Sequence, residues 1–243
     1  MPYRRLPNTD MARFKALQKA YQKGKELPPF KLAFTQSTLQ KVMSFLPRFE
    51  KTMIQQKAAM NFQRERNLEH LAHIRKVKMY ISHFIQVVNM AIQRGELPLS
   101  VLEYYKLNET GCKVPPLNSE DEICAVGQNL IEGETARIRK GLSPITNPTI
   151  AVVKVWYEKF LEAYTDQKNL QMVTARAQKD IALIRPEADE IILTIWNEVE
   201  NSFKDLPDDL KREKACEYGL VYVYRKTEVV SQIVIKPQVL GIG

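Results

Sequence analysis

Leu39–Ala91 reads LQKVMSFLPRFEKTMIQQKAAMNFQRERNLEHLAHIRKVKMYISHFIQVVNMA. With Leu39 at position a of a heptad, the register holds over eight heptads, and 12 of the 16 a and d positions are apolar. Such a sustained repeat predicts a long helix packed at a shallow angle against another helix. Because glycine is absent and Pro47 is the only proline, we expect one helix over 37–94, kinked at Pro47.

A second stretch of similar length begins at Asn147-Pro148, where a capping residue precedes a proline suited to the first helical position. It predicts a helix over 148–203 with Pro186 as its only interior breaker. About 50 residues join the two long helices, which is enough for them to lie antiparallel along their whole length. Shorter helices are predicted over 9–23, ending at Gly24, over 119–140, beginning with a Ser119–Glu122 capping box, and over 208–218.

The C-terminal part of the sequence changes period. Residues 220–235 are rich in β-branched and aromatic side chains on either side of Arg225-Lys226-Thr227-Glu228, which is typical of a β-hairpin. The expected fold class is therefore mainly α. We expect a single domain over residues 1–243, an elongated antiparallel helical bundle built on two long helices, with a small C-terminal β-hairpin over about 220–235.

Composition and the absence of known motifs argue against several classes of enzyme and against a membrane-spanning or secreted protein. The 243 residues contain only nine glycines, and none of the glycine-rich phosphate loops, nucleophile elbows or zinc-protease motifs occurs. No run of 18 apolar residues predicts a membrane span, and the start of the chain has no apolar stretch typical of a secretory signal. Three widely spaced cysteines favour a reducing compartment, so we expect a cytoplasmic protein.

The middle of the first long helix interrupts its own apolar repeat. Gln56, Gln63, Asn67 and His70 occupy a or d positions, and antiparallel pairing places Asn67 and His70 opposite about residues 170–176. That stretch is polar as well. The sequence predicts a polar core layer, which is either a register-fixing network, a solvated waist or a pocket. The candidate residues are Gln63, Asn67, His70, Gln167, Gln171 and Thr174.

A metal site in this midsection would need inward carboxylates and Glu-x-x-His pairs on facing helices. Glu69 and His73 share a face at i, i+4, and Glu158, Glu162 and Asp166 repeat every four residues. No Glu-x-x-His pair occurs, however, and all three histidines fall in one helix. We therefore expect no metal and no cofactor, and we expect lysines at 154 and 159 to pair with the acidic repeat.

Charge is divided unevenly along the chain. Residues 1–95 hold 18 Lys and Arg against five Asp and Glu, whereas residues 96–243 hold 18 and 23. The favoured interpretation is that the two halves pack together, so that the acidic side chains of one compensate the basic side chains of the other. The alternative is a nucleic-acid surface on the basic half. Its candidate contacts are Arg64, Arg66, Arg75, Lys76 and Lys78.

Both ends of the chain carry a resemblance. The stretches YRRLPNTD at 3–10, IRPEAD at 184–189, IWN at 195–197 and EYGLVYVYR at 217–225 resemble a family of helical bacterial proteins with no known activity. The resemblance implies a bacterial origin and brings no cofactor or site residues.

These features favour a non-catalytic protein-interaction or structural helical bundle. We expect a protein partner or self-association, the latter through the C-terminal strands. Two alternatives stay open, namely a nucleic-acid-binding protein and a bundle with a metal or small-ligand site in its polar midsection.

Overall fold

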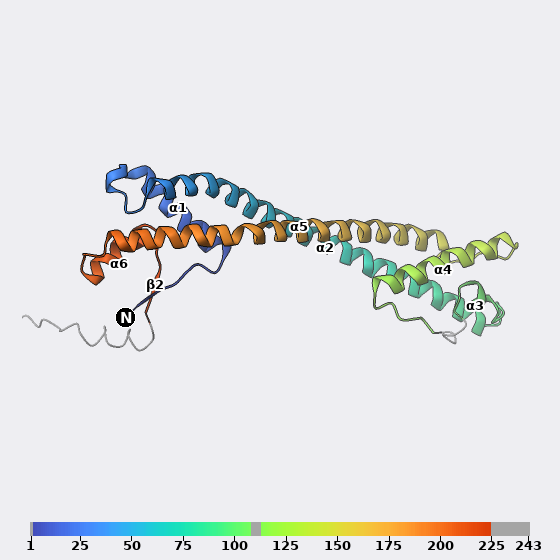
Figure 1. The fold of residues 1–243 in the computed structure, drawn as a ribbon. Coiled ribbons are helices and arrows are strands. Elements are labelled where there is room, and N and C mark those ends of the chain that lie inside the picture. The colour runs from blue at the N-terminus through green and yellow to red at the C-terminus, as the bar shows by residue number, and fades with distance from the viewer. Residues whose placement is uncertain (1, 108–112, 225–243) are drawn as a thin grey trace, which may run out of the picture. The chain divides into compact units, whose positions relative to one another are not determined.

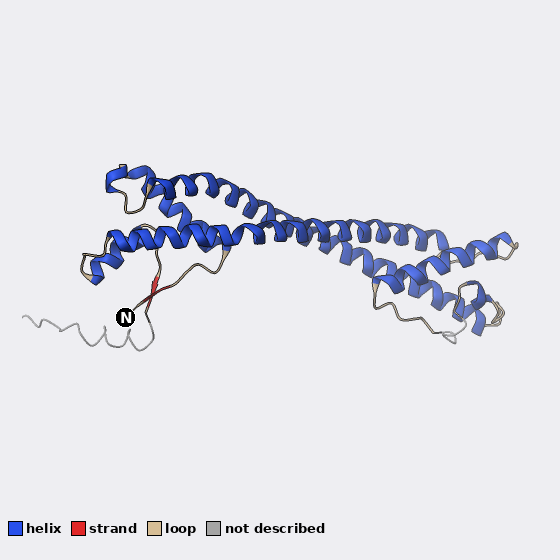
Figure 2. Cartoon of the chain, viewed as in Figure 1, coloured by secondary structure: helices blue, strands red, loops and turns tan. Residues whose placement is uncertain are grey.

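The computed structural model describes residues 2–107 and 113–224. These residues are mainly helical, with two very short strands, as Figure 2 shows. In chain order the elements are β1 (Tyr3–Arg4), α1 (Asp10–Glu26), a 3₁₀ turn (Pro29–Lys31), α2 (Gln36–Gln93), α3 (Val101–Tyr104), α4 (Glu120–Arg139), α5 (Ile150–Ser202), α6 (Asp208–Glu217) and β2 (Tyr222–Val223) (Figure 1). The predicted fold class is confirmed, and both Pro47 and Pro186 lie inside their long helices. Within 2–107 and 113–224, no helix has the length and apolar content that a membrane span requires.

Contacts divide the chain into two compact units, and both long helices contribute to each. Unit 1 takes residues from Met1–Ala58 and Ala175–Gly243, and unit 2 is Ala59–Thr174. In unit 1, Thr38 of α2 donates a hydrogen bond to Glu198 of α5. In unit 2, Tyr80 of α2 stacks on Trp156 of α5. The long helices run antiparallel within each unit, as predicted. That the units form one domain stays a prediction.

The core of unit 1 forms where α1 and α6 cover the long helices. The side chain of Thr9 caps α1 by accepting a hydrogen bond from the Ala12 amide at 3.2 Å. Buried apolar side chains come from α1, α2, α5 and α6, and they include Leu17, Phe49, Trp196 and Ala215. The prediction that Gly24 ends the first helix is wrong, because α1 continues to Glu26. The missing side chain of Gly24 instead makes room for Leu39 of α2.

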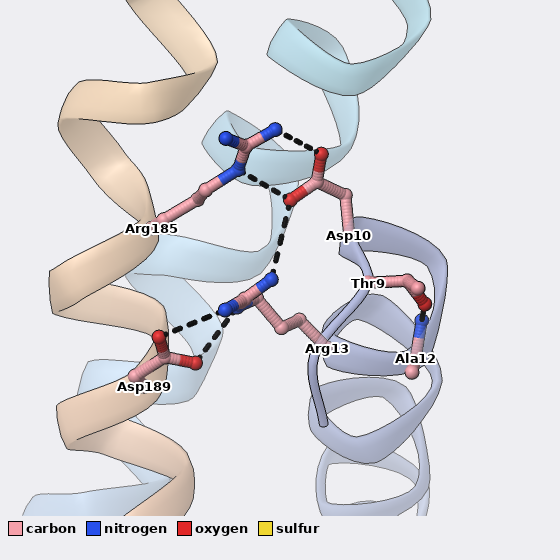
Figure 3. Close-up of polar contacts among 6 residues, drawn as sticks. All are labelled: Thr9, Asp10, Ala12, Arg13, Arg185 and Asp189. Carbon is pink, nitrogen blue, oxygen red and sulfur yellow. Dashed lines mark hydrogen bonds and ion pairs between the residues drawn. The ribbon is translucent and has the colours of Figure 1, made fainter. Parts of the chain in front are cut away.

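Four charged residues fix α1 against α5. Figure 3 shows Asp10 accepting two hydrogen bonds from Arg185, at 2.8 and 2.7 Å. Arg13 donates to both carboxylate oxygens of Asp189, at 2.7 and 3.0 Å, and also lies 3.5 Å from Asp10. Forked arginine–carboxylate pairs fix direction as well as distance, so this network orients α1 on α5.

The two short strands join the ends of unit 1. Tyr3 pairs with Val223 and Arg4 with Tyr222, in an antiparallel sheet. Glu200 of α5 holds both strands, because it accepts hydrogen bonds from Arg4 at 2.9 Å and from Tyr222 at 2.7 Å. The prediction was a hairpin within 220–235, and in the structure the strand at Tyr222–Val223 is present and pairs antiparallel with Tyr3–Arg4, near the start of the chain. The second predicted strand, 229–235, lies outside the described residues.

In unit 2, α3 and α4 pack on the long helices around a second apolar core that includes Phe84, Leu130 and Phe160. The predicted capping box at Ser119 and Glu122 is present at the start of α4. The start of α5 differs from the prediction. Asn147 has a φ of 56°, whereas an N-cap residue needs extended backbone, so α5 begins at Ile150 rather than at Pro148.

Candidate functional site

A polar pocket of about 300 Å³ lies between α2 and α5 within unit 2. Its α2 wall comes from residues 66–73 and its α5 wall from residues 159–167. Three carboxylates and two cationic side chains line it, together with two histidines and one glutamine. The lining residues are Arg66, Glu69, His70, His73, Lys159, Glu162, Ala163, Asp166 and Gln167. The pocket thus lies at the polar midsection that the sequence predicts.

His70 is the most buried polar residue of this pocket, with 3% of its surface exposed. Its Nε2 lies 2.5 Å from Oε1 of Glu120, the first residue of α4. The imidazole also stacks beside two rings of α5, with centroids 6.1 Å from Phe160 and 6.4 Å from Tyr164. Because these two ring contacts and the contact at Nε2 hold the imidazole, its orientation is fixed.

Gln167 lies opposite on α5 and is 7% exposed. Its Nε2 donates to Oδ1 of Asn67 at 3.3 Å. One polar atom in each of two pocket side chains has no hydrogen-bond partner among the residues that the structure describes, and these atoms are His70 Nδ1 and Gln167 Oε1. Buried polar atoms rarely stay unpaired, so each needs a partner.

The register of the long helices differs from the prediction by almost two turns. Asn67 meets Gln167 and Ala59 meets Thr174, whose hydroxyl donates to the Ala59 carbonyl at 3.4 Å. The placement of Asn67 and His70 opposite residues 170–176 is therefore wrong. The prediction aligned the ends of the two helices, whereas apolar and aromatic contacts set the register by placing His70 against Phe160 and Tyr164.

The structure brings together only part of the predicted polar layer. Asn67, His70 and Gln167 lie at one level, and buried Thr174 lies nearer Ala59. Gln63 is half-buried, and Gln171 is exposed. The layer is therefore smaller than predicted.

Most of the residues considered for a metal site also line the pocket. Glu69, His73, Glu162 and Asp166 all line it, whereas Glu158 pairs with Lys154 at 3.8 Å. Lys159, expected to pair with the acidic repeat, lies with its Nζ 4.8 Å from the Trp156 ring centre. Within the described residues, no three His, Cys, Asp or Glu side chains are grouped closely enough to hold a metal ion.

A second polar cluster in unit 2 is fully buried and internally paired. Glu134 accepts hydrogen bonds from the Tyr105 hydroxyl, from Arg137 Nε at 2.9 Å and from the Ile145 amide at 2.7 Å. Arg137 also donates to the Ser143 carbonyl at 2.6 Å. Burial, followed by the bond to Glu134, raises the pKa of Tyr105 above its ordinary value. Because its groups satisfy one another, this cluster is structural.

The five predicted nucleic-acid contacts do not share one surface. Arg66 lies at the pocket and donates to Glu69 at 2.6 Å, and Lys76 lies with its Nζ 5.8 Å from the Trp156 ring centre. Lys78 is half-buried. Arg64 and Arg75 are exposed, and their spacing of 11 residues places them on one stripe of α2.

That stripe carries exposed apolar side chains between the arginines. Met60 is 46% exposed, Leu68 67%, Leu71 40% and Met79 36%. With Arg64 and Arg75 they follow one another at intervals of three or four residues, which is the spacing of a single helix face. We call Met60, Arg64, Leu68, Leu71, Arg75 and Met79 the outer stripe of α2.

Sequence reasoning missed three features of these sites. It assigned Met60 to the buried seam, it did not pair Glu120 with His70, and it overlooked Glu134 and Arg137. A signal for the last pair existed, since Glu134 and Arg137 continue the four- and three-residue spacing of Ile123, Gly127 and Leu130. No local pattern could have paired Glu120 with a histidine 50 residues away.

Comparison of the chain with family models, curated proteins and solved structures finds no match. The resemblance of the chain's ends to a helical bacterial family therefore gains no support from it.

Proposed function

We propose that this protein is a non-catalytic interaction protein whose outer stripe on α2 docks an acidic amphipathic helix of a protein partner. The observation that carries the proposal is the exposure of Leu68 and Leu71, 67% and 40%, at the centre of a regular helix face. Apolar side chains at three- and four-residue spacing are those that a second helix covers when two helices pair. Covering them removes apolar surface from water, which favours binding.

The positive charge of the outer stripe favours a partner helix that carries acidic side chains. Arg64 and Arg75 flank the two leucines, and neither forms an ion pair with any residue of 2–107 or 113–224. A partner helix with Leu or Ile facing Leu68 and Leu71, and with Glu or Asp beside them, complements this stripe in both polarity and sign.

The same charges disfavour a second copy of the stripe as the occupant. In an antiparallel pair centred between Leu68 and Leu71, Arg64 of one copy faces Arg75 of the other. In a parallel pair, each arginine faces its own equivalent. Like charges oppose each other in both arrangements, so self-association through this stripe is weaker than binding of an acidic helix.

Nucleic-acid binding is the second candidate, and the basic composition of residues 1–95 favours it. The structure distributes its five candidate residues over different sides of α2, and two leucines separate the arginines on the outer stripe. Phosphate binding gains nothing from exposed leucines, which is why the acidic helix is the better-supported ligand.

The test uses the full chain and a designed peptide of about four heptads, with leucine at a and d and glutamate at e and g. Fluorescence anisotropy measures its affinity, beside those for a peptide with lysine at e and g, a DNA duplex and a single-stranded RNA. We expect the glutamate peptide to bind, and Leu68→Ala combined with Leu71→Ala to weaken it about tenfold or more. Met172→Ala, at an exposed apolar position of α5 in the same unit, is the matched control and should bind as the parent does.

Other results reject the proposal. Equal binding of the glutamate and lysine peptides would remove the role of charge. Tight, salt-sensitive binding of DNA or RNA without peptide binding would assign the surface to nucleic acid. Dimerisation in sedimentation velocity that Leu68→Ala abolishes would make a second copy the occupant.

A further inference from the structure

The pocket in unit 2 has two unsatisfied acceptors whose chemistry is defined. An ionised carboxylate only accepts hydrogen bonds, so the proton between His70 and Glu120 is assigned to Nε2, and in the neutral form of the imidazole Nδ1 then carries a lone pair. Gln167 uses its amide nitrogen as donor to Asn67, which leaves Oε1 as an acceptor. Both atoms belong to side chains at least nine-tenths buried, and both side chains line the pocket.

The charge of the pocket is complementary to a cation. Glu69, Glu162 and Asp166 contribute three carboxylates, against Arg66 and Lys159. Arg66 is paired with Glu69 at 2.6 Å, so the carboxylates of α5 outnumber the single remaining cationic side chain, Lys159. The two carboxylates of α5 and the two lone pairs would repel an anion. All four groups can accept a hydrogen bond from an ammonium ion.

We propose that this pocket binds a small aliphatic amine as its ammonium ion. One ammonium has three N–H donors, which match Nδ1 of His70, Oε1 of Gln167 and a carboxylate from Glu162 or Asp166. Hydrogen bonds to a charged donor are stronger than neutral ones, and the stacked His70 ring holds its lone pair in place before binding. The volume of about 300 Å³ suits a short alkyl chain behind the ammonium. This site is separate from the outer stripe, and the proposal does not depend on docking there.

The test titrates the full chain with 1,4-diaminobutane, with 1,4-butanediol as its neutral analogue and with succinate as an anion of similar length. Calorimetry gives the affinity, and the ¹⁵N signal of His70 Nδ1 reports the occupied acceptor. We expect saturable binding of the diamine alone, with a shift of that signal. A fourth titration uses lysine with both ends capped, because a partner's lysine carries the same ammonium. Capped lysine binding more tightly than the diamine would assign the pocket to a protein and overturn the small-molecule proposal.

Substitutions of pocket residues test whether the diamine binds in this pocket. Gln167→Leu, of similar size, should weaken the diamine about tenfold or more, because one hydrogen bond to a charged group is lost. Glu162→Gln with Asp166→Asn changes only exposed positions, so the fold is kept, and it should also weaken binding. His83→Gln, at an exposed histidine of α2, is the control and should leave the affinity unchanged. Absence of diamine binding, equal binding of the diol, preference for succinate, or unchanged affinity in both pocket variants would each overturn the proposal.

Discussion

Nε2 of His70 lies 2.5 Å from Oε1 of Glu120, which connects the middle of α2 to the first turn of α4. Glu120 is well placed there, because a carboxylate at a helix N-terminus interacts favourably with the helix dipole. The pair ties together residues 50 apart in the chain and engages Nε2 of His70, whose side chain also lines the pocket. The polar midsection is thereby part of the packing of unit 2.

The buried Glu134–Arg137 pair predicts strong coupling between its members. Both side chains are almost fully buried, at 0% and 1% exposed. Glu134→Ala should cost about 3–5 kcal/mol in the free energy of unfolding, because it leaves the Arg137 charge unpaired. Glu134→Leu combined with Arg137→Met should cost much less than the sum of its single changes. Urea unfolding of the four proteins measures this coupling, and additive costs would show that the pair does not act as a unit.

Gly133 predicts an effect opposite in sign to the usual glycine-to-alanine change. Alanine normally stabilises a helix interior by about 1 kcal/mol relative to glycine. A Cβ at position 133 would overlap the backbone carbonyl of Tyr104 and approach the Tyr105 ring to 2.7 Å, so Gly133→Ala should lower the melting temperature. Gly24→Ala is the comparison and should lower it less, since the atoms in its way belong to the side chain of Leu39 and not to backbone. An equal or higher melting temperature for Gly133→Ala would contradict the close packing of α3 on α4.

The capping box of α4 predicts a pH dependence of stability. The backbone amides of Ser119 and Asn118 donate to the Glu122 carboxylate and hold its pKa below the ordinary value. The stability that ionised Glu122 adds is therefore complete above the ordinary pKa and is lost as the pH falls through the lowered folded-state pKa. Glu122→Gln, which cannot ionise, should be less stable than the parent at neutral pH and approach it in acid.

Urea unfolding of both proteins across the acidic range measures that difference. Ser119→Ala removes the other half of the box and should cost about 1 kcal/mol at neutral pH. A gap between the parent and Glu122→Gln that stays constant with pH would show that ionised Glu122 does not contribute.

The network between α1 and α5 predicts a larger effect than an exposed ion pair. Asp10 is 18% exposed and contacts both Arg185 and Arg13, whereas Arg48 and Glu187 form a half-exposed pair. Asp10→Ala should cost on the order of 1 kcal/mol, and Arg48→Ala close to nothing. Thermal unfolding compares the two variants. Equal small shifts would mean that the apolar core alone orients α1.

Much of the fold follows from local sequence rules. The heptad from Leu39 predicts the long helix, and Ser119 with Glu122 predicts the start of α4, because helix periodicity and caps depend on neighbours within a few residues. The level at which Asn67 meets Gln167 was not predictable in this way, since sliding one long amphipathic helix along another keeps an apolar face in contact. The contacts of His70 with Phe160 and Tyr164 decide that level, and they are set by packing.

The pocket could be predicted only in outline. Polar side chains at a and d positions indicate a polar level, and the acidic repeat that includes Glu162 and Asp166 indicates its charge. The heptad register from Leu39 places Leu68 and Leu71 at positions b and e, outside the apolar seam, but it does not say whether another helix covers them. The tertiary packing of unit 2 decides which face of α2 is covered by α4 and which face stays exposed.

Reversing the charge of the outer stripe is the decisive test of helix docking on α2. The parent chain and the variant carrying Arg64→Glu and Arg75→Glu are each titrated with the glutamate and lysine peptides. We expect the variant to bind the glutamate peptide about tenfold or more weakly and to gain affinity for the lysine peptide. Unchanged affinity of the variant for the glutamate peptide, with no gain for the lysine peptide, would contradict docking on the outer stripe.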